Sequence, residues 1–181
     1  MNKDELTPGA PLNYEGVLDE LTCSKWGKVL GYITKPMIKG ALIPYSEVGV
    51  PVDIQVYTHE NDPNIYKQRI YSLRNRKPIM FTSHMRRAKN GDVLEYVGMG
   101  LGMKLIVFEK ETNLHFESDG YFWDIGFCRI PIPAIFTPGK TFLKHMNESP
   151  GRFSIRIEIV HPLLGTTFVQ AGAFNEKAKS I

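Results

Sequence analysis

Apolar and polar side chains alternate without a break between Arg152 and Ile159. In an extended chain this alternation puts the apolar side chains on one face and the polar ones on the other, which is the pattern of a strand with one buried face. A helix would scatter the same side chains around its axis. The segment therefore predicts a β-strand that borders an apolar core. Its apolar positions are Phe153, Ile155, Ile157 and Ile159.

Shorter runs with strand-like patterns follow one another through most of the chain. The strands predicted in this way are 14–21, 50–57, 66–73, 79–85, 93–99, 102–110, 114–118, 121–125, 127–132, 152–159 and 167–174. Between two of them, Asn90-Gly91 is the strongest hairpin signal, because this pair adopts the left-handed backbone angles of a tight turn. Strands at such short spacing predict a mainly antiparallel β fold, a curved sheet or barrel of about eight to ten strands with one helix.

The segment from Ser24 to Ile43 carries that helix, because its apolar side chains recur three or four positions apart. The apolar arc consists of Trp26, Leu30, Ile33, Met37 and Ala41, and the opposite arc of Lys25, Lys28, Lys35 and Lys39. We expect Ser24 to cap the helix, Pro36 to kink it and the apolar arc to pack on the sheet. The lysine arc fits a solvated outer face. It would also fit contact with an anionic membrane or an acidic partner, and the sequence does not choose between these alternatives.

The length of 181 residues suits one domain, which we place at 12–175 between tails at 1–11 and 176–181. A net charge of +3 is too small to argue for nucleic-acid binding. Residues 1–11 lack the apolar core of a signal peptide, so a soluble cytoplasmic protein is expected. Cys23 and Cys128 are expected to be free thiols, and the histidines do not have zinc-ligand spacing, so we predict no metal and no cofactor.

The interior of a barrel of about eight strands has room for side chains or for one small ligand. Arg69 and Arg129 each stand among aromatic or apolar neighbours, where an unpaired guanidinium is costly to bury. Each therefore predicts a carboxylate partner or an anionic ligand. Our first hypothesis is a non-enzymatic module that binds an apolar or amphipathic small molecule, with one of these arginines at its anionic head. The predicted ligand-binding residues are Arg69, Tyr96, Met99, Gly100, Phe108, Trp123, Arg129 and His161.

Three glycines stand at alternate positions in the segment Gly98-Met99-Gly100-Leu101-Gly102. A phosphate-binding glycine loop would follow a strand and open a helix, whereas here strand patterns stand on both sides. In an extended chain the three glycines would share one face, where another element can approach the backbone closely. That face fits a packed helix, a bend at a barrel corner or the floor of a ligand cavity.

Two further hypotheses remain open. The second is an enzyme or enzyme subunit that uses His161, or else His115 with Glu117, which alternation puts on one face of a strand. The chain has no Gly-x-Ser-x-Gly elbow, no His-Glu-x-x-His and no Walker loop, so catalytic residues stay unassigned. The third hypothesis is an accessory domain that docks on a partner through the predicted helix, which charge reversal at Lys28 and Lys35 would test. The structural alternative for His161 is a hydrogen bond to a loop carbonyl at a corner.

The order of several segments resembles a bacterial family catalogued as domain of unknown function 4166. The matching segments are Tyr14–Leu21, Trp26–Pro44, Gln68–Tyr71, Gly120–Tyr121, Arg129–Pro133, Phe153–Ile159, His161–Gly165 and Gly172. The resemblance covers roughly 12–174, nearly the whole chain. It implies no catalytic set, because none is established for the family. Members occur alone or attached to domains such as a saccharopine-dehydrogenase-like dinucleotide-binding domain, and they usually start with a helix where this chain has a proline-containing segment.

Overall fold

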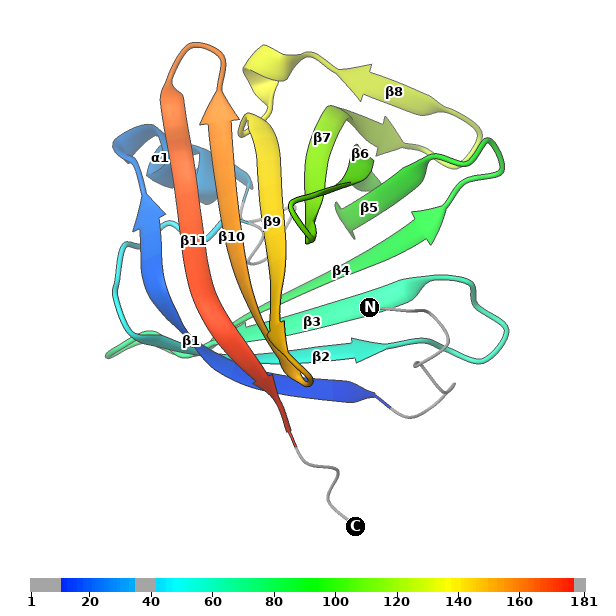
Figure 1. Cartoon of the computed structure of the whole chain (residues 1–181). Coiled ribbons are helices and arrows are strands. Elements are labelled where there is room, and N and C mark those ends of the chain that lie inside the picture. The colour runs from blue at the N-terminus through cyan, green and yellow to red at the C-terminus, as the bar shows by residue number, and fades with distance from the viewer. Residues whose placement is uncertain (1–10, 35–41, 178–181) are drawn as a thin grey trace.

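The computed structural model describes residues 11–34 and 42–177, which form a sheet of antiparallel strands curled into a barrel (Figure 1). The strands are β1 (Leu12–Cys23), β2 (Val50–Tyr57), β3 (Ile65–Tyr71), β4 (Ile79–Arg87), β5 (Val93–Gly98), β6 (Leu101–Lys110), β7 (Asn113–Asp124), β8 (Arg129–Ile132), β9 (Lys140–Ser149), β10 (Arg152–His161) and β11 (Gly165–Glu176). The helices are α1 (Lys25–Thr34) and the 3-10 helix η2 (Ala134–Phe136). Within these two ranges, no helix is long and apolar enough to cross a lipid bilayer.

Pairing between β6 and β7 closes the barrel. The order of neighbours runs β6-β5-β4-β3-β2-β1-β11-β10-β9-β7, and β7 then pairs with β6. Ten strands therefore form the ring, while β8 extends it by pairing with the last part of β7. The predicted antiparallel barrel is confirmed, and the predicted Asn90-Gly91 turn joins β4 to β5. Closure removes the unpaired edges that an open sheet of this size would expose.

Alternate side chains of each strand point into the barrel and form its core. On β10 the predicted inward residues Ile155 and Ile159 are each 7% exposed. The register places Phe153 of the same strand opposite Phe174 of β11, which is completely buried. The core is also tight near the end of β1 that leads into α1, where Leu18 is 0% exposed. The alternation that predicted the strands therefore also predicted which side chains of β10 face inward.

α1 packs on the barrel through glycine rather than through its large apolar side chains. A Cβ atom on Gly27 would lie 2.2 Å from the carbonyl oxygen of Thr167 in β11, so only glycine permits this approach. The expected inner arc is therefore wrong in part. Leu30 faces the barrel interior, but Trp26 is 56% exposed and Ile33 is 66% exposed. The buried face of α1 is therefore the one on which the helix backbone at Gly27 contacts the backbone of β11.

The start of α1 is as predicted, and its end is not. The Oγ atom of Ser24 accepts a hydrogen bond from the Gly27 backbone N–H at 3.1 Å, so Ser24 caps the helix. Leu42 and Ile43, which the prediction placed in the helix, are not helical. The expected kink and the rest of the predicted arcs lie outside the described residues. These positions are Lys35, Pro36, Met37, Lys39 and Ala41.

The glycine segment at 98–102 forms a hairpin turn rather than an extended stripe. Met99 and Gly100 lie between β5 and β6 with φ angles of 48° and 76°. The expectation that three glycines share one face is wrong, because the chain reverses direction between them. A Cβ atom on Gly100 would lie 2.2 Å from the carbonyl oxygen of Asp124, so β7 approaches the turn closely, as at a barrel corner.

Candidate functional site

The barrel encloses a cavity of about 1590 Å³. A ring of ten strands is wider than the eight-stranded barrels whose inward side chains fill the interior, so space remains at its centre. Most of the lining is apolar and comes from alternate positions of the strands. Examples are Val56, Phe81, Leu105, Phe116, Leu143 and Ile157. The cavity is larger than the usual ligand pocket of about 300–1,000 Å³, so a long apolar molecule fits inside.

The cavity reaches solvent at the turn between β9 and β10. Exposed residues 148–152 line it there, together with Arg87 at the end of β4. At the end next to α1, the lining residues Leu42 and Ile43 are 7% and 2% exposed. The cavity therefore has an entrance with polar side chains at the turn between β9 and β10, and a buried apolar wall at Leu42 and Ile43 beside α1.

Four polar side chains of β3, β4 and β5 gather on one wall of the barrel, and we call Lys67, Arg69, Ser83 and Glu95 the interior charge cluster. Lys67 and Arg69 occupy alternate positions of β3, and the register places Ser83 opposite Lys67. The Oε1 atom of Glu95 lies 2.9 Å from Lys67 Nζ and accepts a hydrogen bond from Ser83 Oγ at 2.8 Å. Arg69 donates to Ser83 Oγ at 3.3 Å, and its guanidinium lies 5.5 Å from the ring centre of Phe81.

The interior charge cluster carries one positive charge in excess. Burial alone would raise the pKa of Glu95, but Lys67, Arg69 and the Ser83 hydroxyl together lower this pKa below its usual range. Burial lowers the pKa of Lys67, and the neighbouring carboxylate offsets part of that shift. At 2.9 Å the Lys67 ammonium and the Glu95 carboxylate attract each other strongly in a low-dielectric interior, and their charges cancel. The guanidinium of Arg69 is always charged and is therefore the excess cation.

A second polar contact crosses the barrel from β3 to β11. The Tyr71 hydroxyl donates to Gln170 Oε1 at 3.3 Å, and the two residues are 3% and 2% exposed. The amide Nε2 of Gln170 has no hydrogen-bond partner within the described part of the chain. A buried donor left unpaired costs about 1–3 kcal/mol. Burial raises the pKa of Tyr71 and the charge of Arg69 acts against this rise, so Arg69 lies within electrostatic reach of the contact.

Strands β7 and β9 add neutral polar groups to the interior. The hydroxyl oxygens of Tyr121 and Thr141 lie 2.7 Å apart, and burial raises the pKa of Tyr121. The ring of His145 stacks on Phe153 with centres 4.8 Å apart, and burial lowers the pKa of this histidine. Both groups are therefore neutral at pH 7, and they leave the charge of Arg69 uncompensated.

Of the two arginines predicted to hold an anion, Arg69 lines the cavity and Arg129 does not. Arg129 Nε lies 3.3 Å from Asp124 Oδ2, to which the Tyr96 hydroxyl also donates, at 2.7 Å. Arg86 lies 3.4 Å from the same carboxylate oxygen. This group stands on the outer face of the barrel. Arg129 thus has the carboxylate partner that the sequence left as one of two alternatives.

The other aromatic and glycine residues predicted to bind a ligand lie away from the cavity lining. Trp123 donates its indole N–H to the carbonyl oxygen of Met99 at 3.0 Å, beside the turn that contains Gly100. Met99 is 67% exposed and Trp123 is 45% exposed. Phe108 stacks on His115 with ring centres 5.2 Å apart. The structure brings Met99, Gly100 and Trp123 together at one outer corner and leaves Phe108 apart from them.

His161 makes its hydrogen bonds at a corner of the barrel and is 3% exposed. Its Nδ1 atom accepts hydrogen bonds from the backbone N–H groups of Leu163 and Leu164 at 3.1 and 3.2 Å. The ring proton therefore sits on Nε2, which donates to the carbonyl oxygen of Ile135 at 3.2 Å. Both ring nitrogens are thus occupied within the protein, in the arrangement named as the structural alternative.

The other pair considered for acid-base chemistry lies outside the barrel. His115 and Glu117 alternate with Leu114 and Phe116, which line the cavity. The carboxylate of Glu117 forms a 2.8 Å ion pair with Lys140. Among the described residues, no three His, Cys, Asp or Glu side chains come together as a metal ion would require.

Sequence reasoning missed most of the interior polar residues. Lys67 and Tyr71 stand two positions either side of Arg69, so an inward Arg69 implies that all three face inward. Glu95 stands between Val93 and Val97 at the same spacing. This spacing in the sequence could therefore have identified Lys67, Tyr71 and Glu95 as inward-facing residues. The contact between β3 and β11 could not be predicted in this way, because it depends on the curvature of the closed ring.

The comparisons with known proteins place the chain in a family without assigning an activity. A search of curated proteins gives no match. The model of the family described as a domain of unknown function, DUF4166, matches residues 4–174. This match covers the barrel from β1 to β11 almost completely, including α1 and all of the interior charge cluster. The chain therefore belongs to the DUF4166 family.

Proposed function

We propose that the barrel binds an apolar or amphipathic small molecule with its anionic head near Arg69. The observation that carries this proposal is a cavity of about 1590 Å³ that combines an apolar lining with an excess cation. A barrel that served only as a scaffold would gain stability by filling this space, because empty interior volume forfeits packing contacts. An apolar interior space with a polar entrance is instead typical of barrels that hold a ligand.

The apolar lining would supply most of the free energy of binding. Each methylene group moved from water into apolar surroundings contributes about 0.8 kcal/mol. A chain of about twelve methylenes would gain roughly 10 kcal/mol, against an association cost of about 4–15 kcal/mol. A long alkyl or polyprenyl chain is therefore expected to bind, whereas a short one does not recover the cost.

Native mass spectrometry of the freshly purified protein, combined with titration of a neutral fluorescent probe such as N-phenyl-1-naphthylamine, tests this proposal. Wild-type protein is expected to carry a small molecule or, once stripped, to bind the probe. Leu143→Trp should weaken probe binding, because Leu143 faces the cavity. Lys144→Trp is the matched control, since it places the same indole on the next residue of β9, outside the lining.

Folded wild-type protein that carries nothing and does not bind the probe would contradict the proposal. Equal probe affinities of the two tryptophan variants would contradict it as well, because the cavity would then not be the binding site.

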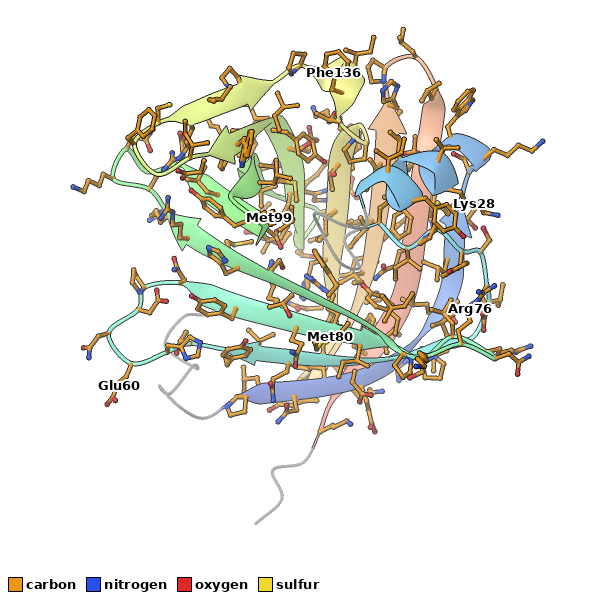
Figure 2. All side chains as sticks on the ribbon, turned by 180° about the vertical axis from the view of Figure 1, so that it is seen from behind. Lys28, Glu60, Arg76, Met80, Met99 and Phe136 are labelled. Atoms are coloured by element: carbon orange, nitrogen blue, oxygen red, sulfur yellow. The ribbon has the colours of Figure 1, made fainter. Side chains whose placement is uncertain are left out.

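A second candidate function, contact with an anionic lipid surface, is favoured by the outer face of α1. Trp26, Val29 and Ile33 are 56%, 46% and 66% exposed there, and Lys25 is exposed on the same helix. Phe136 of η2 is 77% exposed at the same end of the barrel as α1 (Figure 2). Apolar side chains beside basic ones are what interfacial helices use to bind anionic bilayers.

Flotation with phosphatidylcholine vesicles, with and without phosphatidylserine, tests the lipid contact. Binding is expected only with the anionic lipid and should be lost in Ile33→Ser. Val48→Ser is the control, because Val48 is 69% exposed and stands outside α1. Absence of flotation with both vesicle types would remove this candidate.

A further inference from the structure

Two groups inside the cavity are not satisfied by the protein itself. The first is the guanidinium of Arg69, whose hydrogen bond within the described chain is the single one to Ser83 Oγ. The carboxylate of the interior charge cluster, Glu95, is already bound by Lys67 at 2.9 Å and by Ser83 at 2.8 Å. A guanidinium has five N–H donors in a planar fork, so most of those of Arg69 remain available to a ligand.

The second group is the side-chain amide of Gln170. This residue is 2% exposed, and its Oε1 atom is bound by the Tyr71 hydroxyl at 3.3 Å. Its Nε2 atom has no partner among the residues that the structure describes. Gln170 lines the same cavity as Arg69, and its hydrogen-bond partner Tyr71 stands two positions from Arg69 on β3. The residues that line this one apolar space therefore include an excess cation and an unpaired, buried amide donor.

We infer that the preferred ligand is an amphiphile with a single carboxylate, which Arg69 and the Gln170 amide bind inside the barrel. This inference rests on the proposed function, because it names the head group of the molecule that the cavity would hold. One negative charge neutralises the one excess positive charge of the interior charge cluster. A carboxylate also has two oxygens that accept hydrogen bonds, and these match one guanidinium and one amide donor.

Other head groups fit this chemistry less well. An alkylamine would add a second uncompensated cation beside Arg69. A fatty alcohol is neutral and would leave the charge of Arg69 without a counterion. A phosphate monoester carries between one and two negative charges at neutral pH and would leave an excess of negative charge in the cavity. The tail of a carboxylate held at Arg69 has the apolar lining of the barrel to occupy, for example Phe81, Ile155 and Leu105.

Displacement of N-phenyl-1-naphthylamine by hexadecanoic acid, hexadecanol, hexadecylamine and hexadecyl phosphate tests the inference at neutral pH. The acid is expected to bind at least about tenfold more tightly than the alcohol, since charge-assisted hydrogen bonds are stronger than neutral ones. Arg69→Gln should abolish this preference while the alcohol still binds. Gln170→Glu should do the same, because it puts a carboxylate where the ligand head would lie. Arg129→Gln is the matched control on the outer face and should keep the wild-type preference.

Arg69→Lys guards against a folding defect in Arg69→Gln, because it keeps the charge and should retain part of the preference for the acid. Equal affinities of wild type for acid and alcohol would overturn the inference and leave the proposed function intact. A preference for hexadecyl phosphate or hexadecylamine over the acid would overturn it too. Failure of the probe to bind wild type at all would instead refute the proposed function on which the inference rests.

Discussion

Replacing Glu95 by glutamine removes the negative charge of the interior charge cluster with almost no change in shape. Lys67, which lies 2.9 Å from the carboxylate, would then lose its counterion, and the attraction between Arg69 and this carboxylate would be lost as well. Glu95 is 8% exposed, so water screens little of the resulting repulsion. Removal of one partner of a buried ion pair costs about 3–5 kcal/mol. The lower part of this range is expected, because burial lowers the pKa of Lys67 and lets it release its proton.

Thermal unfolding followed by circular dichroism measures this loss. A change of 1 kcal/mol shifts the melting temperature of a protein of this size by about 2–4 °C, so about 3 kcal/mol corresponds to roughly 6–12 °C. Glu117→Gln is the matched control, since it breaks an exposed 2.8 Å pair with Lys140. Exposed pairs contribute less than about 1 kcal/mol, so this control should melt within about 4 °C of wild type. The double variant Lys67→Met/Glu95→Gln should regain part of the loss.

Glu95→Gln that melts together with Glu117→Gln would refute the reasoning. The pair of Lys67 and Glu95 would then not be charged in the folded protein, whereas Arg69 would keep its charge. A double variant less stable than Glu95→Gln would also count against an unpaired ammonium as the cause of the destabilisation.

Three further predictions concern the scaffold. Gly100→Val should lower the free energy of unfolding by at least about 2 kcal/mol in urea titrations, because φ is 76° and the Asp124 carbonyl oxygen occupies the place of a side chain; unchanged stability would contradict the turn geometry. Burial lowers the pKa values of His84 and His145, so the folded state binds fewer protons than the unfolded state, and stability should be full above about pH 6.5 and fall below it. Urea midpoints at pH 5.0 and pH 8.0 measure this difference, which His145→Phe should reduce. His161→Ala should cost about 2–3 kcal/mol through three lost hydrogen bonds and leave probe affinity unchanged, so a selective loss of probe binding would contradict its structural role.

The barrel and most of its strands could be predicted because alternation is a local property of the chain. The strand β9 was not predicted, and β7 was predicted as two strands, 114–118 and 121–125. The run from Arg152 to Ile159 needs no information about distant residues to reveal its inward face, and β10 follows it. The closing contact between β6 and β7 is different in kind. Nothing in either strand distinguishes an edge that closes a ring from an edge that stays open, so the number of strands in the ring could be given only as a range.

The inner face of α1 could not be predicted from hydrophobicity. The apolar arc was expected to bury Trp26 and Ile33, yet both side chains stay outside. Gly27 faces β11 instead, and Gly31 faces Leu42 and Pro44. A helix gains more contact by bringing its backbone next to β11 than by inserting large side chains between the two elements. Arg69 and Arg129 show the same limit. Both stand among apolar residues in the sequence, and only the three-dimensional position of Asp124 gives Arg129 a partner.

The interior polar groups argue for a ligand more strongly than the size of the cavity does. Apolar residues of similar volume at Lys67, Arg69 and Glu95 would leave the fold as stable or make it more stable, because charges in a protein interior pay a desolvation cost that their pairing often does not recover. An unpaired amide on Gln170 adds a further cost. These costs bring the barrel no structural gain, because strand pairing closes the ring whatever side chains face inward. They become favourable once an anion supplies the missing partner, since the excess charge and the free donor then each form a bond inside the apolar space.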